Sequence, residues 1–200
     1  MVEQTEVKIT GEPLPVPTMC RFVVDRPVYE NRSYFFGSRE AAERSPLAKR
    51  LFAIDGVQSV LIAHDCITIT QDGFEPWPVI GKQIGAAIRA HLATGEPAVD
   101  EELWQTLPAP EEIRQRVETI LNEELNPSLA MHGGFVRLVD VKDNVVMLEL
   151  GGGCQGCGMA TVTLKQGVEQ AIRAKVPEVG EIIDVTDHSA GRNPYYTDTP

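Results

Sequence analysis

Two cysteines separated by two residues carry the strongest chemical signal in this sequence. Cys154 and Cys157 lie in the stretch GGGCQGCG, which holds five glycines at 151, 152, 153, 156 and 158. Glycines leave the backbone room to approach a bulky group, and two thiols at this spacing can point at one atom. The stretch follows a predicted strand and precedes a predicted helix, whose N-terminus favours the thiolate that binds soft metals. The motif therefore predicts metal or redox chemistry.

The spacing of the cysteines leaves several chemistries open. A zinc site or an iron–sulfur cluster normally takes four protein ligands, so two chains would combine to supply them. A dithiol oxidoreductase is the alternative from another class, although the intervening Gln-Gly and the short chain that follows fit a thioredoxin-like centre poorly. An inert structural pair is disfavoured, because the flanking glycines serve no core. Spacing alone does not choose between dimer-bridging zinc and iron–sulfur.

Composition narrows the partners and the compartment. The formal net charge of −11 offers nothing to neutralise a phosphate backbone or to dock on an anionic lipid surface, so we expect neither nucleic acid nor membrane partners. The sequence has no recognisable export signal and no apolar run of membrane-spanning length. Four cysteines are too few and too uneven for a secreted disulfide framework. We therefore expect a cytoplasmic protein.

The first half of the chain predicts a small α+β domain over residues 1–95. Stretches rich in β-branched residues predict strands at 7–9, 21–24, 57–63 and 66–70. A helix is predicted to begin at Ser45-Pro46, a hydroxyl cap before proline, and to end at Asp55-Gly56. A second amphipathic helix is predicted from Pro78 to Leu92.

Residues 96–110 are predicted to be a linker. The stretch from Thr94 to Pro110 has three prolines and four acidic residues, without a sustained apolar period. Trp104, with Leu103, predicts either a short helical turn that docks on a domain or an exposed anchor for a partner. We favour docking, because buried aromatic residues are commoner.

The second half predicts another small α+β domain, over residues 111–188, followed by a flexible polar tail, 189–200. Helical periodicity predicts a helix from Glu111 to Leu125 that stops at Asn126-Pro127. The other predicted elements are strands at 135–141 and 145–150, a helix from Leu164 to before Pro177, and a strand at 182–185. The order is α-β-β-α-β, and the second strand leads directly into the cysteine motif.

Other candidate ligands have plainer interpretations. Cys20 and Cys66 belong to the first domain and are expected to be small apolar residues, with Cys66 in a core position. His132 is interpreted as a turn residue between a helix and a strand, and Gly133-Gly134 as part of that turn.

Longer motifs resemble a known family. Three motifs of the second half closely resemble the C-terminal domain of Nfu and NifU proteins. They are LAMHGG at 129–134, GGGCQGCGM at 151–159 and VTLKQGVE at 162–169. The separate N-terminal domain of Nfu proteins is resembled by SPLAKRLFAIDGV at 45–57, ITIT at 67–70, and Trp77. Many members have Asp directly before the Gly-Gly pair of LAMHGG, whereas this chain has His132. In this feature the chain resembles the bacterial NfuA branch, which usually carries a different N-terminal domain.

This resemblance implies an iron–sulfur cluster carrier without catalytic turnover. Family members hold a [4Fe–4S] cluster between two chains, so the resemblance implies a homodimer whose cluster ligands are Cys154 and Cys157 of each chain. It also implies an upstream cluster donor and apo iron–sulfur client proteins as partners. The N-terminal domain is expected to recognise partners.

Overall fold

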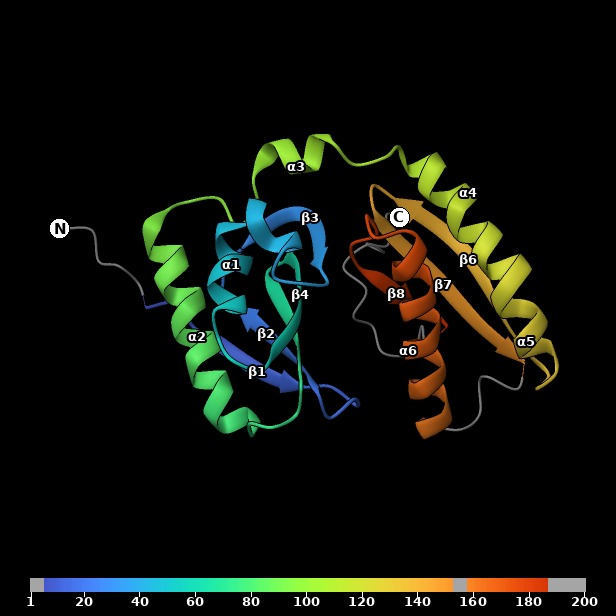
Figure 1. Ribbon diagram of the computed structural model, residues 1–200, viewed down its shortest axis with the longest axis horizontal. Coiled ribbons are helices and arrows are strands. Elements are labelled where there is room, and N and C mark those ends of the chain that lie inside the picture. Colours follow the sequence, from blue (N-terminus) through green and yellow to red (C-terminus); the bar gives the residue numbers. More distant parts are fainter. Residues whose placement is uncertain (1–5, 153–157, 187–200) are drawn as a thin grey trace, which may run out of the picture.

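The computed structural model describes residues 6–152 and 158–186. It confirms the α+β class, with helices packed on two separate sheets (Figure 1). Each sheet has its own hydrophobic cluster, one drawn from residues 20–99 and the other from residues 113–182. Among the helices that the structure describes, none has the length and apolar character needed to cross a membrane.

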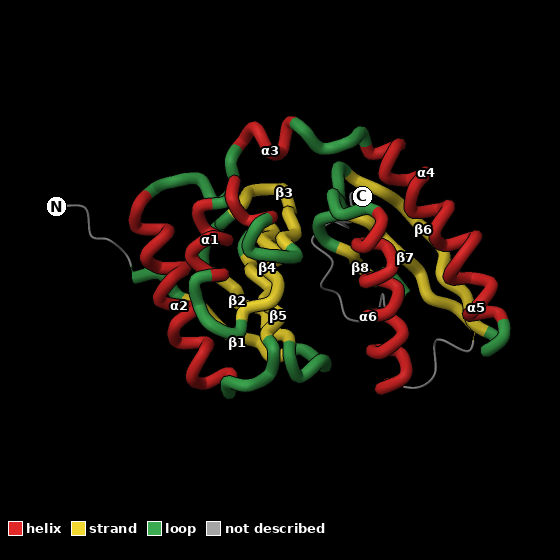
Figure 2. Tube along the Cα trace, viewed as in Figure 1, coloured by secondary structure: helices red, strands yellow, loops and turns green. Residues whose placement is uncertain are grey.

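Five antiparallel strands and two main helices form the N-terminal unit. Its elements are β1 (Ile9–Pro13), β2 (Met19–Val24), β3 (Tyr29–Phe36), the 3-10 turn η1 (Ala41–Arg44), α1 (Pro46–Phe52), β4 (Val57–His64), β5 (Cys66–Gln71) and α2 (Trp77–Thr94). The strand order is β1-β2-β5-β4-β3. The helices α1 and α2 pack together on one side of this sheet, as Figure 2 shows, where they bury Phe22, Ile62 and Ile84. Strand β3 lies at an edge.

Three details of this unit differ from the sequence prediction. Strand β3 was not predicted, because Asn31 has a left-handed backbone (φ 54°) and the pairing register shifts before Ser33, which breaks the alternation of a regular strand. The first strand begins at Ile9, where the predicted one ends. Helix α1 ends at Phe52, and Gly56 takes its positive φ of 90° in the turn that follows.

The first part of the segment predicted as a linker packs on the N-terminal unit. Ala98 and Val99 are buried in its core, and the short helix α3 (Glu101–Gln105) follows. The Trp104 ring meets Tyr29 edge-on at 6.1 Å between centroids, and the Arg32 guanidinium lies 4.8 Å from its centroid. The predicted docking of Trp104 is therefore confirmed. The boundaries of the linker stay a prediction.

Ser45 ties this segment to α1, which makes it a sensitive position. Its buried hydroxyl accepts a hydrogen bond from the Ala48 amide (3.0 Å) and donates one to the Ala98 carbonyl (2.6 Å). We expect Ser45→Ala to lower the free energy of unfolding by about 1–3 kcal/mol, because both a helix cap and a buried carbonyl lose their partner. Urea unfolding followed by tryptophan fluorescence measures this loss. Ser38→Ala, which removes an exposed cap at Ala41, is the control and should cost less; equal losses would contradict the prediction.

A mixed three-stranded sheet with helices forms the C-terminal unit. Its elements are α4 (Pro110–Ile120), the π-helical turn η2 (Leu121–Leu125), α5 (Asn126–Ala130), β6 (Gly134–Lys142), β7 (Val145–Gly152), α6 (Gly158–Lys175) and β8 (Ile182–Asp184). The strand order is β6-β7-β8, in which β6 and β7 are antiparallel and β8 runs parallel to β7. The predicted order of elements is confirmed.

The predicted helix stop at Asn126-Pro127 is wrong. The helix passes through the π-helical turn and restarts as α5, which places Pro127 in the first turn, where a missing N–H breaks no helical hydrogen bond. Asn126 then pairs with β6: its Nδ2 donates to the Val136 carbonyl (2.9 Å), and its Oδ1 accepts from the Val136 amide (2.8 Å). A long-range contact thus overrides the local signal.

Candidate metal centre

The cysteine motif lies between two described elements of the C-terminal unit. Cys154 and Cys157 fall outside the described residues. Strand β7 ends at Gly152 and α6 begins at Gly158, and both ends lie at the end of the unit that carries α5 (Figure 1). The strand-to-helix position predicted for the motif is therefore confirmed by its flanks.

Pairing on both sides holds the end of β7. Gly151 pairs with Phe135 and Gly152 with Gly134 across the β6–β7 ladder. On the other side, the Leu150 amide donates to the Thr186 hydroxyl (2.7 Å), just beyond β8. The end of β7, which leads into the cysteines, is therefore held in place by hydrogen bonds on both of its edges.

A close ring contact explains one glycine of the motif. The Phe135 ring covers Gly151 so closely that a Cβ at this position would overlap it. Glycine at 151 therefore lets an aromatic side chain lie over the strand directly before the cysteines. This role of Phe135 was not predicted from the sequence, although the register of the β6–β7 hairpin places Phe135 opposite Gly151.

Two large apolar side chains are exposed near this end of β7. Phe135 is 46% exposed and Met131 is 80% exposed, both unusual for large hydrophobic residues. The turn between α5 and β6 contains an exposed His132, and Gly133 has a left-handed backbone (φ 71°) with its amide donating to the Ala130 carbonyl. The interpretation of His132 and Gly133 as turn residues is confirmed.

Helix α6 adds a favourable field for thiolates. It runs for 18 residues from Gly158, so its positive end lies next to the cysteine motif in the chain. Two thiols per chain make half of a four-ligand set. Within residues 6–152 and 158–186, no group of three or more His, Cys, Asp or Glu side chains could hold a metal.

The other two cysteines lie in the N-terminal sheet. Cys20 is 3% exposed in the hydrophobic core, where desolvation raises the pKa of its thiol, which confirms its apolar role. Cys66 lies half-buried outside that core, so the predicted core position is wrong. Desolvation, with the nearby Glu181 carboxylate, raises the pKa of the Cys66 thiol to about 12. Both thiols are therefore protonated at neutral pH, which makes them poor metal ligands.

Family models match both units of the chain. Residues 9–95 match the N-terminal region of the scaffold protein Nfu/NifU, and residues 117–183 match the NifU-like domain. Both matches agree with the resemblance found in the motifs.

Individual relatives point to the same family. The human protein "NFU1 iron-sulfur cluster scaffold homolog, mitochondrial" is 33% identical over 183 residues, which cover 90% of this chain and 72% of the human protein. The "Fe/S biogenesis protein NfuA" of Pseudomonas aeruginosa is 53% identical over 85 residues, which cover 42% of this chain and 44% of NfuA. Among solved structures, a NifU-like protein from Saccharomyces cerevisiae matches at a TM-score of 0.45 and 24% identity, covering 50% of this chain and 91% of that protein. The chain therefore belongs to the Nfu/NifU family of iron–sulfur cluster scaffold proteins.

Proposed function

We propose that two copies of this chain hold one [4Fe–4S] cluster through Cys154 and Cys157 of each copy and transfer it to apo-proteins. The observation that carries the proposal is the placement of a two-thiol motif between the held end of β7 and the start of α6. Two thiols per chain require two chains, because such a cluster takes four thiolates.

Handover in this proposal is ligand exchange, without turnover of a substrate bond. An incoming client thiolate replaces one cysteine ligand at a time, while the β6–β7 frame and α6 keep their own hydrogen bonds. An upstream donor loads the cluster by the reverse exchange. A reducing compartment such as the cytoplasm suits this chemistry, because it keeps free thiols reduced.

Cluster binding and dimer formation should be linked. Since each chain supplies half of the ligands, the cluster binds only the dimer and stabilises it by mass action. We expect the apo-protein to be monomeric or weakly dimeric, and the reconstituted protein to be a dimer with about one cluster per two chains. Sedimentation of both forms at the same low concentration, with iron and sulfide analysis, tests this expectation.

Three outcomes would count against the proposal. A monomer that carries a complete cluster would rule out bridging. Zinc in place of iron and sulfide would indicate a dimer-bridging structural metal. A colourless protein whose Cys154 and Cys157 exchange with disulfides, and which fails anaerobic reconstitution, would indicate a dithiol oxidoreductase.

A further inference from the structure

The two units of the chain meet through buried hydrogen bonds. Asn144, in the β6–β7 turn, donates from Nδ2 to the Ser33 carbonyl of β3 (3.0 Å). The Ser33 hydroxyl accepts from the Glu181 amide (3.0 Å), just before β8. Ser33 is fully buried and Asn144 is 1% exposed. We call Ser33, Asn144, Gly180 and Glu181 the interdomain clasp; it covers part of the open edge of the N-terminal sheet.

Gly180 allows the close approach within the clasp. A Cβ at this position would lie 2.9 Å from both the Ser33 carbonyl oxygen and Asn144 Nδ2, and closer still to the Ser33 hydroxyl. The Gly180 amide donates to the Asn144 carbonyl (2.9 Å) within the C-terminal unit. A methyl group here would therefore push mainly against the other domain.

Helix α6 lies between the two sheets (Figure 1). Its apolar side, with Val168 and Ile172, belongs to the C-terminal core. Its charged face, which we define as Lys165, Glu169 and Arg173, recurs every four residues along the helix.

Arg173 joins α6 to both parts of the interface. Its guanidinium lies 3.9 Å from the centroid of the Phe35 ring of β3. It also donates to the carbonyls of Val179 and Gly180, each at 2.7 Å, and so braces the clasp. The N-terminal unit therefore contacts the helix that begins directly after the cysteine motif.

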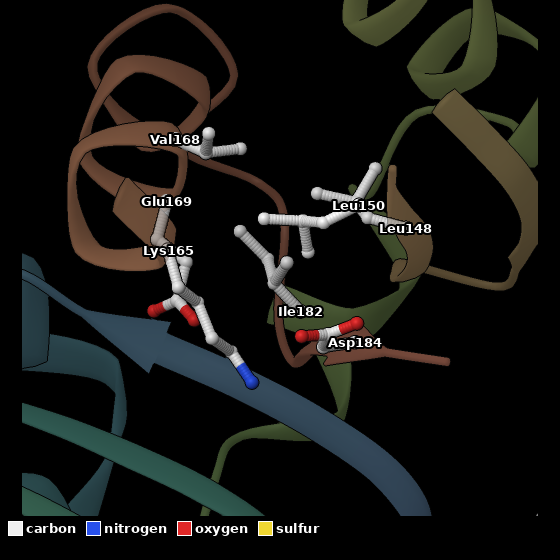
Figure 3. A pocket seen from close by; sticks show the side chains of 7 residues that line it. All are labelled: Leu148, Leu150, Lys165, Val168, Glu169, Ile182 and Asp184. Atoms are coloured by element: carbon white, nitrogen blue, oxygen red, sulfur yellow. The ribbon is translucent and has the colours of Figure 1, made fainter. Parts of the chain in front are cut away.

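Charged side chains gather beside this interface. Figure 3 shows Lys165 and Glu169 on α6 and Asp184 of β8 around a small hollow. Within the described residues, two buried atoms at this seam lack a hydrogen-bond partner, Arg21 Nε of β2 and Glu178 Oε2. Unpaired buried polar atoms cost free energy, and these two can bind water when the units separate. This gain favours opening and opposes the hydrogen bonds of the clasp.

One carboxylate at the clasp, that of Glu181, makes closure sensitive to protons. Desolvation raises the pKa of Glu169, which faces Lys165, Arg173, Glu181 and Asp184, against the lowering effect of the two cations. It also raises the pKa of Glu181, which faces Arg21 and Asp65 of the N-terminal unit as well as Lys165 and Arg173. The pKa of Arg173 is lowered only to about 10, so it stays charged near neutral pH. The amide of Glu181 belongs to the clasp and its carboxylate faces charges of both units, so closing the interface adds to the desolvation of Glu181 and favours its protonation. The charges that Glu169 faces all belong to the C-terminal unit, so its raised pKa does not depend on closure.

We propose that the N-terminal domain docks reversibly on the charged face of α6 through the interdomain clasp, and that docking is strengthened by protons. Because a carboxylate with a raised pKa is protonated more readily in the docked form, docking is favoured as the pH falls toward the acid side and weakens as the pH rises through the raised pKa. Opening exposes the charged face of α6. This docking does not depend on a bound cluster.

Nitrogen-15 relaxation of the full apo chain tests the docking. Domains that are docked tumble together, whereas released domains each give a shorter rotational correlation time. We expect Gly180→Ala to shorten both correlation times relative to the unmodified chain. The matched control is Gly167→Ala on α6, where a Cβ meets nothing within 4 Å, and it should tumble as the unmodified chain does.

A variant in the N-terminal domain provides a second test in case Gly180→Ala does not fold. Ser33→Val removes the hydroxyl that accepts from the Glu181 amide, leaves the sequence of the C-terminal unit unchanged, and should also shorten both correlation times. If Gly180→Ala fails to fold, Ser33→Val decides the question. Unchanged tumbling in a folded Ser33→Val chain, or separate tumbling of the unmodified chain at acidic as well as alkaline pH, would overturn the proposal.

The proton linkage has its own test. The unmodified chain should show longer correlation times as the pH is lowered from mildly alkaline to mildly acidic values. Glu181→Gln should lose this dependence, whereas Glu112→Gln on the exposed surface of α4 should keep it. A pH dependence that persists in Glu181→Gln would refute the assignment to this carboxylate.

Discussion

Replacing either Cys154 or Cys157 by alanine is expected to abolish stable cluster binding. Each substitution removes two of the four thiolates of a bridged cluster, because both chains of the dimer carry it. Anaerobic reconstitution with iron and sulfide, followed by metal counting and Mössbauer spectroscopy, measures the loss. The same variants should also fail to form the cluster-stabilised dimer in sedimentation.

The other two cysteines supply matched controls. Cys66→Ser changes a half-buried thiol, and Cys20→Ala avoids placing a hydroxyl in the core, where Cys20 is 3% exposed. Both variants should keep the full cluster content. Normal cluster content in Cys154→Ala, or loss of iron from a folded Cys66→Ser protein, would show that the ligands have been misassigned.

Ile172→Ala is expected to destabilise the C-terminal unit alone, by about 2–5 kcal/mol, the usual cost of such a cavity. Ile172 is fully buried on α6, and its cluster contains no residue of the N-terminal cluster. The loss is a large part of the stability of a small domain. Urea unfolding followed by circular dichroism should show an earlier transition.

The positions of the tryptophans make this measurement specific to each domain. Both tryptophans of the chain, Trp77 and Trp104, pack against the N-terminal cluster, so their fluorescence reports on that unit. Ile172→Ala should leave the fluorescence midpoint nearly unchanged. The matched variant Ile62→Ala, equally buried in the N-terminal core, should lower it. A single transition that shifts equally in both variants would contradict the predicted division of the chain.

Contiguous residues were enough to predict the candidate thiol site and most of the local structure. The thiol pair Cys154 and Cys157 and its glycines are neighbours in the chain, so their type and spacing are visible without a fold. Elements with strong periodicity, such as α2 and the β6–β7 hairpin, were predicted because each shows its buried face in its own pattern. The family motifs, now matched over both units, likewise depend on contiguous residues.

The contacts between the two units could not be predicted from the sequence and are visible only in the folded chain. Ser33 and Asn144 are 111 residues apart, and neither side chain follows a periodicity that marks a contact at that distance. The same reason explains why β3 was missed and why the helix passes Pro127, since the sheet edge and the Asn126 contact with β6 form only in the folded chain. Local patterns report which face of an element is apolar, whereas polar contacts between distant elements depend on the geometry that folding brings together.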